Sequence, residues 1–275
     1  MLTTPGTMWT DALTPLRWLL RGSGFLLHAS LGLVPAVLAQ GRLGHAVKIG
    51  DRSLALIMLN WWSGWTCRLF GLKPTVYGRP IDGPALMVAN HLSWADIQAM
   101  HSVAAMSFVA KAEISTWPIM RTIANAGGTI YHQRGSQDSQ HGALAQVMQR
   151  LEDGGRVAIF PEGGIFGGTE VKRFHARMFK VAQDSGCTVQ PVMIRYVRDG
   201  KRDPEITFLP GENFLMNLIR FMGRPGSRAE VAFLEPYEPG DLPRKALASR
   251  AETAVREAYD SPAGEPPAWV GEALT

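Results

Sequence analysis

The chain has 275 residues, 46% of them hydrophobic and 19% charged, a balance that excludes a disordered chain. The mean hydropathy of −0.02 is too low for a polytopic membrane protein. The length favours one main domain with an appendage. The net charge of +4 suits binding to an anionic lipid surface. The sequence has no basic cluster of the kind that binds nucleic acid. Cys67 and Cys187 are too few and too far apart for a disulfide framework or a Cys-based metal site.

The N-terminal quarter carries two apolar stretches. Residues 22–40 contain no Lys, Arg, Asp or Glu, and their length is close to the ~20 residues that cross a bilayer. Residues 54–72 are rich in large apolar and aromatic side chains, including three tryptophans, which favour the headgroup boundary. We therefore predict membrane-associating helices in residues 1–72.

Several arrangements of these helices stay open. Two helices could lie in one leaflet, or one short span could be followed by an interfacial helix. A cleaved signal peptide is disfavoured because the basic start comes only at Arg17 and a further apolar segment follows at once. Two ordinary core helices of a soluble protein are the plain alternative.

Residues 73–260 alternate between strand-like and helical patterns. This alternation predicts an α/β domain with a mixed sheet flanked by helices, followed by a flexible tail over 261–275. Pro191 suggests an edge strand or a bulge. The expected strands are 85–89, 107–110, 129–132, 157–160, 189–194, 206–209 and 231–234, and the expected helices are one beginning at Trp94 with Ser93 as its N-cap, 139–153, 176–185 and 246–259.

The first candidate for chemistry follows the strand 85–89. His91 stands after the strand, and Asp96 stands in the first turn of the next helix, where its carboxylate can accept from the imidazole Nδ1–H. Nε2 is then free to act as a base toward a substrate hydroxyl. By itself the spacing is a weak signal, since the chain has seven His. No second His or Cys lies nearby, so a metal site is a weaker interpretation.

Three further segments attract attention. Phe160–Gly164 follows a strand and presents Glu162, although taken alone a surface turn with a solvated Glu is the favoured explanation. Gly127–Arg134 ends in Arg134, whose planar guanidinium suits a phosphate or carboxylate, and a plain surface arginine is the alternative. Val189–Val192 is typical of a structural strand.

In this order, over about residues 85–196, the four segments resemble the glycerolipid acyltransferase family, best known for the 1-acylglycerol-3-phosphate acyltransferases. The first family motif is Asn-His, four residues and Asp, and the second is a Gly-rich strand ending in Arg. The third is Phe-Pro-Glu-Gly, and the fourth is a strand containing Val and Pro. The matching positions are Asn90, His91 and Asp96, then Gly128–Arg134, then Phe160–Gly163, then Val189–Val192.

The resemblance implies a reaction. A fatty acyl group would move from a thioester, on acyl carrier protein or coenzyme A, to the free hydroxyl of a lysolipid. His91 would be the general base, Asp96 would orient it, and the hydroxyl would attack the thioester without an acyl-enzyme. The resemblance further implies no metal, no cofactor and a place on the cytoplasmic face of the inner membrane. The substrate-binding residues would be Asn90, Arg134, Glu162 and Gly163.

The sequence departs from the family after Glu162 and Gly163. The family usually has Thr or Ser there, often followed by Arg, whereas this chain has Gly-Ile-Phe-Gly-Gly at 164–168. Lys172 or Arg173 would then substitute for the missing cation. Phe174–Phe179 is similar to lyso-ornithine lipid acyltransferases, which acylate an acyl-chain hydroxyl on an aminolipid without phosphate. We expect 1-acylglycerol-3-phosphate, giving phosphatidate, as first acceptor and lyso-ornithine lipid as second.

Two other functions stay open. An inactive relative would bind lipid without chemistry, and an acyl-thioester hydrolase would use His91 to activate water.

In the folded domain we expect His91, Asp96, Arg134 and Glu162 to line one groove. An apolar tunnel for the acyl chain would start near His91, with Trp94, Phe108 and Trp117 in its wall.

Overall fold

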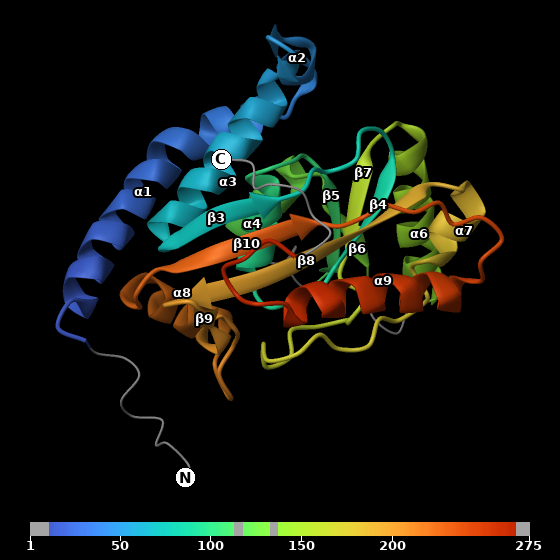
Figure 1. Cartoon of the computed structure of the whole chain (residues 1–275). Helices are drawn as coiled ribbons and strands as arrows, with labels where there is room; N and C mark the ends of the chain where they lie inside the picture. Colours follow the sequence, from blue (N-terminus) through green and yellow to red (C-terminus); the bar gives the residue numbers. More distant parts are fainter. Residues whose placement is uncertain (1–10, 113–117, 133–136, 268–275) are drawn as a thin grey trace.

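The computed structural model describes residues 11–112, 118–132 and 137–267, apart from the side chains at 118–120 and 137–141. Within these residues, eight strands form one sheet in the order β3-β10-β8-β4-β7-β5-β6, with β9 beside β8 (Figure 1). The strands are β3 (Leu72–Tyr77), β4 (Ala85–Ala89), β5 (Ser107–Lys111), β6 (Ile130–His132), β7 (Arg156–Ile159), β8 (Thr188–Arg198), β9 (Lys201–Arg202) and β10 (Ser227–Phe233).

The sheet is mixed, as predicted. Strands β8, β4, β7, β5 and β6 run parallel, whereas β10 is antiparallel to β8 and parallel to β3. Helix α9 (Arg244–Asp260) lies across one face, and α3 (Leu54–Leu69) and α4 (Ala95–His101) cover the other (Figure 1). The helices that follow β3 are α4 (Ala95–His101), α5 (Pro118–Ala126), α6 (Gln137–Glu152), α7 (Lys180–Ser185), α8 (Phe214–Gly223) and α9 (Arg244–Asp260). β3, β9, α5 and α8 were not predicted.

The two N-terminal helices are confirmed. Helix α1 (Thr14–Leu38) lies beside α3 (Leu54–Leu69), and α2 (Arg42–Ala46) and a hairpin of β1 (Lys48–Ile49) and β2 (Arg52–Ser53) connect them. Ser53 Oγ accepts from Leu56 N–H and caps α3. On α1, Trp18 Nε1 donates to the Ile219 carbonyl of α8 at 2.8 Å, so the helix contacts the main domain along its N-terminal half.

Pro191 lies in the interior of the sheet, so the expected edge strand is wrong. The expected bulge is present beside it, because Leu234 bonds to Pro191 and Tyr237 pairs with Val189, which leaves residues 235 and 236 opposite Gln190. Strand β8 pairs with β4 on one side, where Val88 is opposite Pro191, and with β10 on the other. The Pro191 carbonyl accepts from Leu234 N–H, one residue past the end of β10. The Pro191 nitrogen faces the same side and has no hydrogen to donate back to Leu234, whose carbonyl accepts instead from Gln190 Nε2 at 3.1 Å.

Residues 206–209 do not form the predicted strand. A 3₁₀ turn covers Pro204–Ile206, and a buried guanidinium takes the place of a neighbouring strand. Arg220 Nη2 donates to the Thr207 carbonyl at 2.6 Å, and Nη1 donates to the Glu205 carbonyl. The helix expected over 176–185 is shortened to α7, because residues 176–179 form tighter turns with i to i+3 hydrogen bonds. The helix after His91 begins at Ala95, and Ser93 Oγ accepts from Ala95 N–H at 3.3 Å.

A buried ion pair joins the sheet to the C-terminal helix. Arg195 on β8 and Glu230 on β10 are both fully buried, with Nη2 and Oε2 2.8 Å apart. The same guanidinium donates to carbonyls at the end of α9 and beyond it, including that of Ser261 at 2.7 Å. The first residues of the predicted tail therefore lie against Arg195.

We predict that Arg195→Met destabilises the protein by about 3–5 kcal/mol, because the buried Glu230 charge loses its buried partner and keeps only the partly exposed Arg228, 3.6 Å away. Urea unfolding gives the change in free energy. The double variant Arg195→Met/Glu230→Met should recover part of the loss, whereas Lys180→Ala, which breaks the exposed pair with Asp184, should cost under about 1 kcal/mol. Equal losses in the single and double variants would contradict this account.

Candidate active site

His91 and Asp96 meet at the carboxyl end of β4. The chain leaves the strand at Ala89 and turns into α4 at Ala95, which brings Nδ1 of His91 to 2.8 Å from Oδ2 of Asp96. The Asp96 side chain is fully buried, and 17% of the His91 side chain is exposed. The predicted pair therefore exists, with its base at the surface and its carboxylate in the interior.

Asp96 accepts three further hydrogen bonds. Its Oδ2 accepts from the backbone N–H groups of Leu92 (2.7 Å) and Ser93 (2.9 Å), and its Oδ1 accepts from the Tyr196 hydroxyl (2.6 Å). Burial raises the pKa of Tyr196 well above its usual value, so this group stays a donor. The carboxylate thus faces four donors, which requires Nδ1 of His91 to carry its proton and leaves Nε2 as the acceptor. Sequence reasoning missed Tyr196.

The His91 ring is held by aromatic stacking. The Phe160 ring lies parallel to it, with centroids 4.0 Å apart and 13° between the planes. Phe108 stacks behind Phe160 at 5.7 Å and 16°. Nε2 forms no hydrogen bond with any residue that the structure describes. The stack and the carboxylate fix the ring plane, so a substrate hydroxyl has one free nitrogen to approach.

Glu162 lies beside His91, as predicted. It follows β7, the neighbour of β4, and is 5% exposed. Lys172 N–H donates to its Oε1 at 3.3 Å, and the backbone N–H of His91 also donates to the carboxyl group. Burial raises the pKa of Glu162 to about 8, and the negative charge of Asp96 adds to the rise. The side chain is therefore mostly protonated near neutral pH and can donate a hydrogen bond from its second oxygen.

The other predicted site residues lie in different settings. Asn90 is fully buried, and its amide both donates to and accepts from the Ile194 backbone at 2.8 Å, so it aligns β4 with β8. Gly163 is exposed and has a φ of +78°, which favours glycine at this turn. Lys172 is half-exposed and pairs with Glu170, while the Arg173 side chain is exposed. Arg134 lies outside the described residues.

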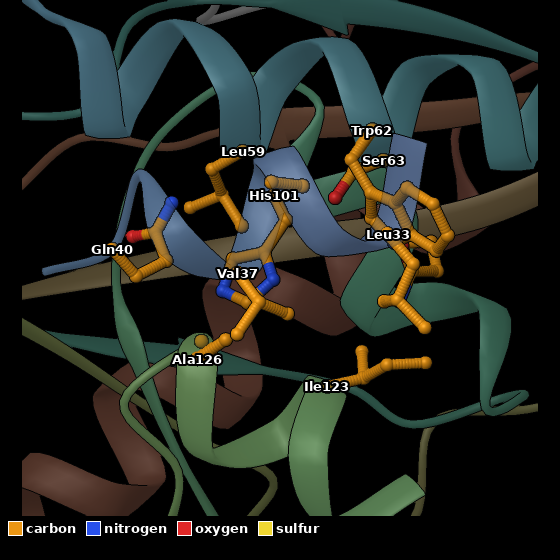
Figure 2. A pocket seen from close by; sticks show the side chains of 12 residues that line it. Leu33, Val37, Gln40, Leu59, Trp62, Ser63, His101, Ile123 and Ala126 are labelled. Atoms are coloured by element: carbon orange, nitrogen blue, oxygen red, sulfur yellow. The ribbon is translucent and has the colours of Figure 1, made fainter. Parts of the chain in front are cut away.

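The residues expected in the tunnel wall lie in different settings. Trp94 contacts Phe70, Phe214 and Phe221, and Phe108 belongs to the stack on His91. Trp117 lies outside the described residues. A cavity of about 30 Å³ lies between α1, α3, α4 and α5, where Leu33, Val37, Leu59, Trp62 and Ile123 converge (Figure 2). In the described part of the chain, no three His, Cys, Asp or Glu side chains are grouped to hold a metal ion.

The raised pKa of Glu162 predicts a pH-dependent stability. An unfolded chain loses this proton near pH 4.5, whereas the folded protein keeps it until about pH 8. Stability should therefore fall by on the order of a few kcal/mol as the pH rises through this window. In Glu162→Gln this contribution should disappear, so the difference in Tm between wild type and variant should change between pH 5 and pH 8.

The matched control is Glu257→Gln, a substitution on the exposed face of α9 that should keep the wild-type pH dependence. Thermal unfolding at several pH values measures all three proteins. Parallel curves for wild type and Glu162→Gln would show that the buried carboxyl is ionised throughout this range.

Comparisons with known proteins identify the family and the fold. The family model described as Acyltransferase matches residues 73–195. A Pseudomonas aeruginosa protein named lyso-ornithine lipid O-acyltransferase is 34% identical, over 88% of this chain and 93% of that protein. A Neisseria gonorrhoeae protein named 1-acyl-sn-glycerol-3-phosphate acyltransferase is 37% identical, over 46% of this chain and 51% of that protein. The crystal structure of PlsC, the 1-acyl-sn-glycerophosphate acyltransferase from Thermotoga maritima, has a TM-score of 0.65 at 21% identity and covers 88% of this chain and 95% of its own. The chain belongs to the acyltransferase family.

Proposed function

We propose that this lysolipid acyltransferase uses lyso-ornithine lipid as its acceptor and an acyl thioester, on acyl carrier protein or coenzyme A, as its donor. The observation that carries the proposal is the share of this chain that each named relative matches. The Pseudomonas relative with that name aligns over 88% of the chain, whereas the Neisseria relative named for 1-acylglycerol-3-phosphate aligns over 46%. This reverses the order of acceptors that the motifs suggested.

The charges around the third motif support the same acceptor. The loop that follows Glu162 begins with Gly163–Gly168 and carries no cation there. Lys172, the nearest described candidate to replace it, already pairs with Glu170, and Arg173 points into solvent. A phosphate monoester calls for fixed positive charge at this position, whereas a hydroxyl on an acyl chain does not.

In the proposed reaction His91 Nε2 takes the proton of the acceptor hydroxyl as its oxygen attacks the thioester carbonyl. The oxygen–carbonyl carbon bond forms, the carbon–sulfur bond breaks, and the thiol leaves with the proton returned from His91. Asp96 stabilises the imidazolium that forms between the two steps. Protonated Glu162 donates a hydrogen bond to the acceptor.

We predict that the purified protein acylates lyso-ornithine lipid in mixed micelles faster than 1-acylglycerol-3-phosphate. His91→Ala should lower kcat/KM by about 100- to 10,000-fold, because the general base is lost. His45→Ala, at an exposed position on α2, is the matched control and should keep wild-type activity. Thin-layer separation of labelled products measures transfer to each acceptor.

Transfer to 1-acylglycerol-3-phosphate alone would overturn the acceptor assignment. Release of free fatty acid without any acceptor, lost in His91→Ala, would instead favour the thioester hydrolase. Unchanged transfer by His91→Ala would exclude His91 as the base.

We also propose that α1 holds the enzyme on the membrane. Among the described helices, α1 is long and apolar enough to cross a bilayer, and most of it is exposed. Its exposed leucines include Leu26, Leu27 and Leu31, each more than 60% exposed. Trp61 and Trp65 of the neighbouring α3 are also exposed. The location on the cytoplasmic face of the inner membrane remains part of this proposal.

Leu27→Gln should weaken binding to anionic liposomes by about tenfold, because a buried leucine side chain contributes about 1.5 kcal/mol or more. The triple variant with Gln at positions 26, 27 and 31 should no longer sediment with liposomes. Leu242→Gln, an exposed leucine just before α9, is the control and should bind like wild type. Equal binding by all of these proteins would show that α1 does not enter the bilayer.

A further inference from the structure

Glu162 belongs to a loop whose two ends meet. His175 N–H donates to the Pro161 carbonyl at 2.9 Å and closes residues 161–175. Glu162 lies at the start of this loop, and its carboxyl accepts from Lys172 N–H on the returning arm. The position of Glu162 beside His91 therefore depends on the placement of the returning arm, residues 168–174.

Helix α9 contacts the returning arm at two points. The Tyr259 hydroxyl donates to the Gly168 carbonyl at 2.7 Å, and Glu252 Oε2 accepts from Phe174 N–H at 2.9 Å. Glu252 and Tyr259 are seven residues apart, so they lie on one face of the helix. The two hydrogen bonds flank Lys172, one before it and one after it.

The arm has little freedom at Gly168. Its φ is +66°, and a Cβ atom there would come within 2.4 Å of Thr207 Cγ2. The backbone of Gly168 therefore lies between Thr207 and the Tyr259 hydroxyl. The neighbouring side chains of Val171 and Phe174 are buried in the core.

Helix α9 is itself held by the sheet. Arg195 of β8 donates to the carbonyls of Ala258 and Tyr259, in the last turn of the helix. Glu252 is fixed from the other side by Arg256, whose Nη2 lies 2.9 Å from Oε1. A rigid path of hydrogen bonds therefore runs from the sheet through α9 to the loop of Glu162.

We propose that Glu252 and Tyr259 are positioning residues that hold the arm 168–174, so that Lys172 N–H keeps Glu162 beside His91. Neither side chain touches the catalytic pair. Their effect on the reaction rests on the proposed function, in which Glu162 binds the acceptor. Loosening the arm lowers the affinity for the acceptor and leaves the thioester site unchanged.

The test uses Glu252→Ala and Tyr259→Phe in the full-length protein. Each variant removes one hydrogen bond to the arm, so the acceptor KM should rise about fivefold while the donor KM stays within about twofold. Amide hydrogen exchange over residues 161–175 should become faster. Glu252→Gln keeps a carbonyl oxygen for Phe174 N–H and should restore both readouts. Glu257→Ala, on the exposed face of α9, should behave like wild type.

A merely structural role would lower apparent kcat through loss of folded enzyme and leave the acceptor KM unchanged, which would overturn the proposal. Unchanged exchange over 161–175 in both Glu252→Ala and Tyr259→Phe would also overturn it. If wild-type enzyme acylates neither acceptor, the proposed function fails, and the hydrogen-exchange comparison alone decides the positioning role.

Discussion

The buried carboxylate of Asp96 is the interaction on which the site depends. A charge in the interior is tolerated when donors surround it, and Asp96 has four of them. Two are backbone N–H groups of the turn between β4 and α4, so the turn must keep its conformation. The third is the His91 ring, and the fourth is Tyr196 on the adjacent strand. The orientation of the base is therefore a property of the sheet as much as of the pair.

Three consecutive residues of strand β8 bond to distant parts of the chain. The backbone of Ile194 bonds to the Asn90 amide, Arg195 reaches α9 on one face, and Tyr196 reaches Asp96 on the other. Successive side chains of a strand point to opposite faces, which is why neighbouring residues can serve both. The cost is a buried guanidinium, which the Glu230 carboxylate and the carbonyls at the end of α9 compensate.

The two halves of the site come from neighbouring parallel strands. His91 follows β4 and Glu162 follows β7, and parallel strands end at the same edge of a sheet. Phe160 at the end of β7 stacks on His91 and completes the contact. Two carboxyl groups near one imidazole then have different environments. Asp96 is surrounded by donors, whereas burial raises the pKa of Glu162 to about 8.

The sequence by itself determined the features whose partners are close in the chain. The spacing of His91 and Asp96, the strand 85–89, the helix α9 and the order of the four motifs are local, and each could be recognised from residue types. The tertiary structure decided the rest. Pro191 is tolerated inside the sheet because Gln190 Nε2 replaces the missing N–H as donor to the Leu234 carbonyl, and Thr207 bonds to Arg220 instead of to a strand. Tyr196 is 100 positions from Asp96, and Tyr259 is 91 positions from Gly168. No period or motif encodes such pairs, since they arise only when the sheet order brings distant segments together.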